Sequence, residues 1–152
     1  MGLSILKTQT LRRVFREVAI IQSLATDRLT AVLPPELTVQ QFSLMSHLVN
    51  TQNGPESPGD LAQIFQVSRP AMTQLLQRLQ ARGEVTLIAS EVDGRARVVH
   101  LTAKGQAVYE GVFSRLENDL SAIASLGDDS ELNELHERLH NLRRFMERQA
   151  GR

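Results

Sequence analysis

The chain has no cysteine among its 152 residues. This absence excludes a disulfide framework, thiolate metal sites and any thiol-based redox switch, so redox sensing would have to use methionine or a bound ligand. A chain of this length can bury a real core without such cross-links. We therefore expect about one domain's worth of compact structure, in a reducing, cytoplasmic compartment.

Long apolar runs are also missing near the N-terminus. The first fifteen residues have only a short apolar stretch before Lys7, Arg12 and Arg13. That stretch is too short for a signal peptide or a membrane span. We expect no membrane partner.

The sequence has no excess of either charge, because 17 Lys and Arg balance 17 Asp and Glu. The overall basic bias of many nucleic-acid binders is therefore absent, and any such site must come from local distribution. Residues 57–105 carry six basic and four acidic side chains, whereas residues 106–152 carry six and nine. This asymmetry is mild.

Two helices are predicted in the first third of the chain. Apolar residues recur at steps of three and four in the first, which Pro34 and Pro35 end. Thr38 and Gln41 form a capping box that opens the second, and Gly54 lies in the turn that closes it. The apolar stripe of the first helix consists of Leu11, Val14, Phe15, Val18, Ile21, Ala25, Leu29 and Val32.

Two further helices are separated by only a short turn. Ser57 suits an N-cap and Pro58 a first helical position, which predicts a helix to about Gln66. Ser68 then caps a helix that runs to Gly83. Two helices joined in this way outline a helix-turn-helix.

The second helix of this pair separates its faces cleanly. Its inner face is apolar, while its outer face is polar and nearly uncharged, a pattern that also fits ordinary solvated surface. The inner residues are Met72, Leu75, Leu76 and Leu79, and the outer ones are Pro70, Thr73, Gln74, Gln77 and Arg78.

A β-hairpin follows directly. Residues 85–88 and 95–101 read as strands, and Asp93-Gly94 between them is a strong hairpin signal, although the loop can be longer than two residues. A hairpin after a helix-turn-helix is a wing.

The remaining chain predicts two long helices. Thr102 can cap the first, and Gly127 marks its end. The last helix carries a near-heptad seam, suited to packing against a helix of the same chain or of a partner. That seam is Leu132, Leu135, Leu139, Leu142 and Met146.

Three segments together resemble the MarR family of bacterial transcriptional regulators. They are residues 61–73 (LAQIFQVSRPAMT), 79–83 (LQARG) and 93–105 (DGRARVVHLTAKG). The family's wing usually has an Asp, one residue, an Arg, a basic strand that ends in Leu-Thr, and a Gly three residues after the Thr. The matching positions here are Asp93, Arg95, Arg97, Leu101, Thr102 and Gly105.

The resemblance implies a mainly α fold with a small β-hairpin wing, formally α+β: a winged helix-turn-helix with long N- and C-terminal dimerisation helices. It implies three regions: a dimerisation helix over residues 1–37, a DNA-binding region over 38–105, and C-terminal dimerisation helices over 106–152.

The resemblance also implies which residues contact DNA. Residues 68–83 become the recognition helix in a major groove, where Arg can hold guanine, Gln can hold adenine, and hydroxyls or the helix N-terminus can hold phosphate. The residues that would face DNA are Ser68, Arg69, Thr73, Gln74 and Arg78. A merely solvated Arg78 is the alternative.

In the wing, Arg95 would enter the minor groove, oriented by Asp93. Asp93 can also be only a turn former, and Arg97 either contacts phosphate or completes a strand. Two features depart from the family pattern. The strand Val85–Ser90 has no basic residue and is flanked by Glu84 and Glu91, which predicts modest phosphate attraction, and Gln66 stands where a small residue is common.

Small aromatic or anionic effectors are a further implication of the family. Arg16, His47 and Tyr109 are candidate effector contacts, although each also fits surface or packing roles. His136 and His140 have metal-clamping spacing but lack an obvious third ligand, so we expect no metal and no cofactor. No catalytic constellation stands out, so we do not expect an enzyme.

The sequence therefore predicts a homodimeric, sequence-specific regulator of transcription. A repressor is the expectation, and an activator is the open alternative. It would bind double-stranded DNA at a palindromic operator and respond to a small effector. The alternative is a winged-helix dimer that binds protein without reading DNA.

Overall fold

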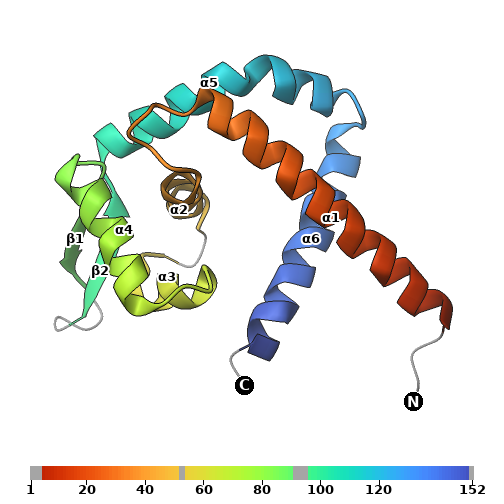
Figure 1. Ribbon diagram of the computed structural model, residues 1–152, viewed down its shortest axis with the longest axis horizontal. Helices are drawn as coiled ribbons and strands as arrows, with labels where there is room; N and C mark the ends of the chain where they lie inside the picture. The colour runs from red at the N-terminus through yellow and green to blue at the C-terminus, as the bar shows by residue number, and fades with distance from the viewer. Residues whose placement is uncertain (1–4, 52–53, 91–95, 151–152) are drawn as a thin grey trace.

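A computed structural model describes residues 5–51, 54–90 and 96–150 of the chain (Figure 1). Within them the fold is helical except for one antiparallel hairpin, as the sequence predicts. The elements are α1 (Ile5–Val32), α2 (Val39–Asn50), α3 (Pro58–Ile64), α4 (Arg69–Ala81), β1 (Val85–Ala89), β2 (Arg97–Leu101), α5 (Ala103–Ala124) and α6 (Asp129–Ala150).

Side-chain caps start four of the helices where the sequence predicts them. Thr38 and Gln41 form the reciprocal capping box of α2. The hydroxyls of Ser57, Ser68 and Thr102 accept backbone N–H groups at 3.2, 3.3 and 3.1 Å at the starts of α3, α4 and α5. These bonds satisfy donors that an uncapped helix leaves without partners.

Helix α3 ends at Ile64, earlier than the predicted end near Gln66. Gln66 has φ of 53°, in the left-handed region, and its backbone N–H donates to the Gln63 carbonyl at 3.2 Å. A left-handed residue cannot continue an α-helix, so Gln66 becomes the turn between α3 and α4.

Helix α5 also ends before the predicted stop. Its C-cap is Ser125, whereas Gly127 stands just before the start of α6. There the Asp128 carboxylate accepts the Glu131 N–H at 2.9 Å, and the Glu131 carboxylate accepts the Asp128 N–H at 3.1 Å. Gly127 therefore precedes a capping box that the sequence analysis did not identify.

The hairpin pairs Val85 with Leu101 at its base and Ala89 with Arg97 at its far end. Strand β2 thus begins at Arg97, two residues later than predicted. The Asp93-Gly94 turn and Arg95 lie outside the described residues.

The core lies in a winged lobe, which we define as α2, α3, α4, β1, β2 and the first half of α5. Helix α2 packs against α5, and the hairpin closes the core behind α4 (Figure 1). The buried apolar residues are Leu37, Phe42, Leu44, Met45, Leu61, Ala62, Met72, Leu76, Leu79, Val85, Val99 and Val112.

The base of the wing is joined tightly to the start of α5. The Thr102 hydroxyl donates to the Gly83 carbonyl at 2.7 Å and lies 3.1 Å from that of Glu84. A Cβ on Gly105 would lie 2.1 Å from the Glu84 carbonyl oxygen. The Leu-Thr-x-x-Gly segment therefore has a structural reason: only glycine allows α5 to approach the wing this closely.

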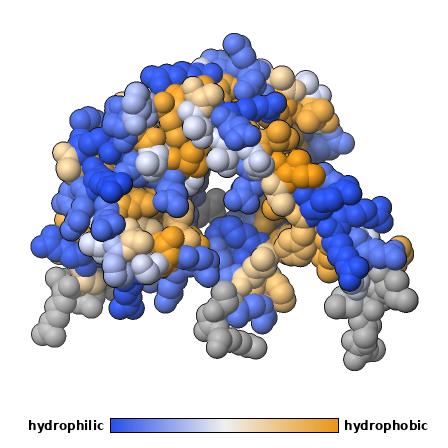
Figure 2. Space-filling view, viewed as in Figure 1, coloured by the Kyte–Doolittle hydropathy of each residue, from blue (hydrophilic) through white to orange (hydrophobic). Residues whose placement is uncertain are grey.

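The terminal helices, defined as α1, the second half of α5, and α6, leave apolar side chains uncovered. Figure 2 shows orange residues on the half of the molecule that α1 and α6 occupy. None of the described helices combines the length and hydropathy needed to cross a bilayer. The most exposed apolar side chains are Leu6, Ile21, Leu24, Leu126, Leu135 and Phe145, each more than half exposed.

Candidate nucleic-acid interface

Helix α4 presents all five predicted contact residues to solvent. Its apolar face is buried in the winged lobe through Met72, Leu76 and Leu79, with Leu75 partly covered. The exposed residues are Ser68, Arg69, Thr73, Gln74 and Arg78.

The N-terminus of α4 favours an anion. It has no acidic residue in its first turn, so no carboxylate of that turn compensates the positive end of its dipole, and Arg69 adds a cation there. The Thr73 hydroxyl donates to the Arg69 carbonyl at 2.9 Å, so its oxygen can still accept a further hydrogen bond. Phosphate is the kind of group that such a helix end accepts.

Gln77 belongs to the same exposed surface but was not among the predicted contact residues. It is exposed, and it follows Thr73 by four positions and Gln74 by three. Residues at these spacings are neighbours on one helix face, so Gln77 lies at the centre of the polar face. Helical periodicity alone was enough to place Gln77 among the predicted contact residues.

Two of the three predicted wing contacts, Asp93 and Arg95, lie outside the described residues. Arg97 is exposed at the start of β2, and its Nη1 donates to the Leu87 carbonyl at 3.3 Å across the hairpin. Arg97 therefore helps to close the hairpin while its side chain stays at the surface.

Glu84, which precedes the first wing strand, is buried in an ion pair. It is 4% exposed and receives a two-pronged ion pair from Arg82, at 2.9 and 2.8 Å. Arg82 also donates to the Glu36 carbonyl at 3.1 Å and to the Gln41 side chain at 3.3 Å. The charge of the Glu84 carboxylate is therefore balanced inside the fold by Arg82. Modest phosphate attraction by the first wing strand stays a prediction, because it rests on the absence of basic residues there. Glu91 lies outside the described residues.

The three candidate effector contacts are not brought to one site. Arg16 is exposed on α1 and pairs with the neighbouring Glu17 at 2.7 Å. Tyr109 on α5 stacks against Phe42, with ring centroids 5.5 Å apart, and its hydroxyl accepts from Asn50 at 3.4 Å. Tyr109 therefore serves the core of the winged lobe in this structure.

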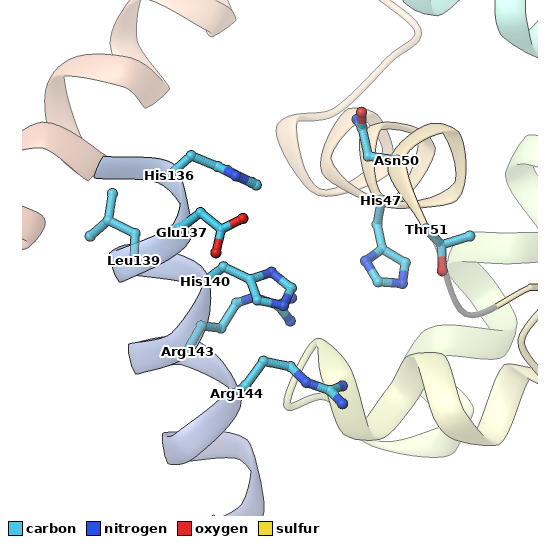
Figure 3. A pocket seen from close by; sticks show the side chains of 9 residues that line it. All are labelled: His47, Asn50, Thr51, His136, Glu137, Leu139, His140, Arg143 and Arg144. Carbon is cyan, nitrogen blue, oxygen red and sulfur yellow. The ribbon is translucent and has the colours of Figure 1, made fainter. Parts of the chain in front are cut away.

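His47, the third candidate, lines a cleft of about 550 Å³ between α2 and α6. Figure 3 shows side chains of α6 directed toward His47 and Asn50 across this space. The cleft is lined by His47, Asn50, Thr51, His136, Glu137, Leu139, His140, Arg143 and Arg144. Its charged side chains are Arg143, which pairs with Glu147, together with Arg144 and Glu137.

His136 and His140 face this cleft from successive turns of α6, with ring centroids 6.1 Å apart. Among the described residues, no group of three or more His, Cys, Asp or Glu side chains is placed to hold a metal ion.

Comparison with known proteins gives a consistent result. A family model described as MarR family matches residues 36–96. The transcriptional activatory protein BadR of Rhodopseudomonas palustris is 33% identical over 118 residues, which cover 77% of this chain and 66% of BadR. The chain thus spans just under two thirds of the length of that relative.

Solved structures show the same fold. A MarR family protein from Bacillus stearothermophilus has 20% identity and a TM-score of 0.68, covering 95% of this chain and 99% of that one. A MepR variant from S. aureus bound to an oligodeoxyribonucleotide has 18% identity and a TM-score of 0.56, covering 87% of this chain and 94% of that one.

Proposed function

The chain belongs to the MarR family, and on that premise we propose that it is a transcriptional regulator that binds double-stranded DNA as a homodimer. The observation that carries the proposal is the outer face of α4, a capped, exposed helix without acidic side chains that projects from a closed core. We propose that α4 enters the major groove of an operator half-site.

The chemistry of α4 supports contact with both phosphates and bases. Its N-terminus and Arg69 suit phosphate, and Gln74 and Gln77 can each donate to and accept from the edge of adenine. Arg78 can donate two hydrogen bonds to the N7 and O6 acceptors of guanine. The MepR variant, which shares this fold, is bound to an oligodeoxyribonucleotide. We propose that Arg95, with Asp93, adds a minor-groove contact from the wing.

The terminal helices support the homodimer. We propose that residues 1–37 and 106–152 pack against the same helices of a second copy and that residues 38–105 bind DNA. Ile21, Leu24 and Leu135 are 62, 53 and 54% exposed in one chain. Apolar exposure on this scale marks an interface, and a symmetric dimer would cover it.

A dimer with two-fold symmetry would place two copies of α4 on half-sites of a palindrome about one helical turn apart. Bound there, the protein would exclude other proteins from the same DNA, which is the basis for proposing repression. BadR is named an activator, so the sign of regulation needs a direct test with a reporter gene placed behind the selected operator.

A small effector would regulate binding by changing the distance between the two copies of α4. We propose the α2–α6 cleft as its site, because this cleft lies between a terminal helix and the winged lobe. A coupling free energy of about 1 to 3 kcal/mol would change DNA affinity about 5- to 150-fold.

The decisive experiment is selection of genomic fragments by the purified protein, followed by binding titrations at several salt concentrations. We expect a palindromic sequence to be enriched and its affinity to fall with salt. The variant Arg78→Ala should weaken binding to this sequence, and Gln40→Ala, an exposed change on α2 outside the terminal helices and α4, is the control. If no sequence is enriched and DNA binding is negligible at all salt concentrations, the chain is a protein-interaction module instead.

Sedimentation equilibrium tests the homodimer separately. We expect a dimer at micromolar concentration. A stable monomer under these conditions would rule out simultaneous binding of two half-sites.

A further inference from the structure

Glu56 forms an isolated antiparallel bridge with strand β2, although it lies far from the wing in sequence. Its carbonyl accepts the Val99 N–H at 2.9 Å, so that β2 is bonded to β1 along one edge and to Glu56 along the other. Val99 is 1% exposed. The position of Glu56 therefore bears on the position of β2 and of Arg97, two residues along the strand.

The side chain of Glu56 is held in turn by α2. Nε2 of His47 lies 2.5 Å from its carboxylate, and the two side chains are only 20% and 13% exposed. A charge-assisted hydrogen bond with so little water around it is stronger than a surface ion pair. Helix α2 is thus bonded through His47 to Glu56, the residue whose carbonyl binds strand β2.

His47 also contacts the helix-turn-helix. Its ring meets that of Phe65 edge to face, with centroids 5.6 Å apart. Phe65 is the C-cap of α3 and directly precedes the turn residue Gln66. One histidine therefore touches both the turn before α4 and the residue that anchors β2, and its ring is visible at the edge of the α2–α6 cleft in Figure 3.

We infer that His47 and Glu56 form a positioning pair, which fixes the wing relative to the recognition helix so that both reach DNA in register. Neither side chain needs to touch DNA for this role. The pair restricts the wing before DNA binds, so less conformational entropy is lost on binding. Such preorganisation raises affinity. The inference rests on the proposed DNA-binding function.

The test compares the pair with the wing and with α4 separately. Binding to the selected operator is measured by fluorescence anisotropy for the full chain and for Glu56→Gln, which keeps the shape of the side chain but removes its charge. The same change is then placed in a wing variant, Arg95→Ala with Arg97→Ala, and in Arg78→Ala. Circular dichroism and sedimentation establish that each variant is folded and assembled as the parent is.

We expect Glu56→Gln to weaken binding about three- to tenfold, the effect of weakening one charge-assisted hydrogen bond. The loss should be nearly absent in the wing variant and undiminished in Arg78→Ala, because only the wing contact depends on the pair. Equal losses in both backgrounds, or no loss in either, would overturn the inference.

A second pair of variants decides the matter if Glu56→Gln does not fold. His47→Gln retains a donor that can reach Glu56, whereas His47→Ala does not, so His47→Gln should bind DNA several-fold more tightly. Equal affinities of the two would overturn the inference. Failure of the unmodified chain to bind any DNA would instead overturn the proposed function, which keeps the two failures distinct.

Discussion

The winged lobe and the terminal helices use the same apolar residue types but bury them very differently. Leu44, Leu61 and Leu79 are 0% exposed in the lobe, whereas Leu24 and Leu135 are more than half exposed on α1 and α6. The lobe therefore completes its own core, and the terminal helices do not. A single chain thus holds one structural unit with a completed core and a set of helices whose apolar side chains stay uncovered.

The largest expected loss of stability comes from a substitution where the wing meets α5. Gly105→Ala places a Cβ 2.1 Å from the Glu84 carbonyl oxygen, which is backbone and has little freedom to move. We expect the free energy of unfolding to fall by more than about 4 kcal/mol, measured by urea denaturation.

Gly111→Ala is the matched control on the same helix, because a Cβ there meets no heavy atom within 4 Å. It should raise stability by about 0.5 to 1 kcal/mol. Similar effects of the two substitutions would show that the close approach at Gly105 does not restrict the fold.

The second prediction compares one leucine from each region. Leu79→Ala leaves a cavity in the lobe and should lower the free energy of unfolding by about 3 kcal/mol, with dimer affinity unchanged. Leu139→Ala, at a side chain 44% exposed in one chain, should instead weaken dimerisation about tenfold or more in sedimentation equilibrium. If Leu139→Ala leaves association unchanged, the seam of α6 is not part of the dimer interface.

The third prediction concerns the ion pair that ties α4 to β1. Arg82→Met leaves the Glu84 carboxylate buried without its partner and should cost about 2 kcal/mol, reduced from a fully buried pair because the Arg82 side chain is 23% exposed. The double variant, Arg82→Met with Glu84→Gln, should recover part of this loss of stability, measured by thermal unfolding. An additive loss in the double variant would mean that the pair does not interact.

The smallest effect is expected at the turn of the helix-turn-helix. Gln66 has φ of 53° and its side chain donates to the Gln63 carbonyl at 2.8 Å. Gln66→Gly and Gln66→Ala both remove that bond, so their difference isolates the backbone. Gly should be more stable than Ala by about 1 kcal/mol in urea denaturation, and a more stable Ala variant would contradict the left-handed turn.

Most of the winged lobe could be predicted from sequence because local interactions define its elements. The caps at Thr38, Ser57, Ser68 and Thr102 are confirmed, and so is the order of helices and hairpin. Helix ends were predicted less well. Gln66 and Ser125 end helices without glycine, and neither residue type signals a stop as glycine does.

The candidate site residues also fall into those that sequence could predict and those that it could not. The exposure of Arg69, Thr73, Gln74 and Arg78 follows from helical periodicity, and the same reasoning would have included Gln77. The assignment of Arg16, His47 and Tyr109 to one effector site had no such basis. The structure distributes them among an exposed helix, a cleft and an aromatic cluster.

The sequence by itself determined the order of the helices, the caps of α2 to α5, the presence of a hairpin and the polar face of α4, because residues a few positions apart signal each of them. Only the tertiary structure decided that Glu84 is buried in an ion pair with Arg82 and that His47 is hydrogen-bonded to Glu56 beside the wing. It also decided that Gly105 lies against the Glu84 backbone. The last two contacts join segments 9 and 21 residues apart, and the first depends on burial. Such contacts follow from how the elements pack, which no local pattern encodes.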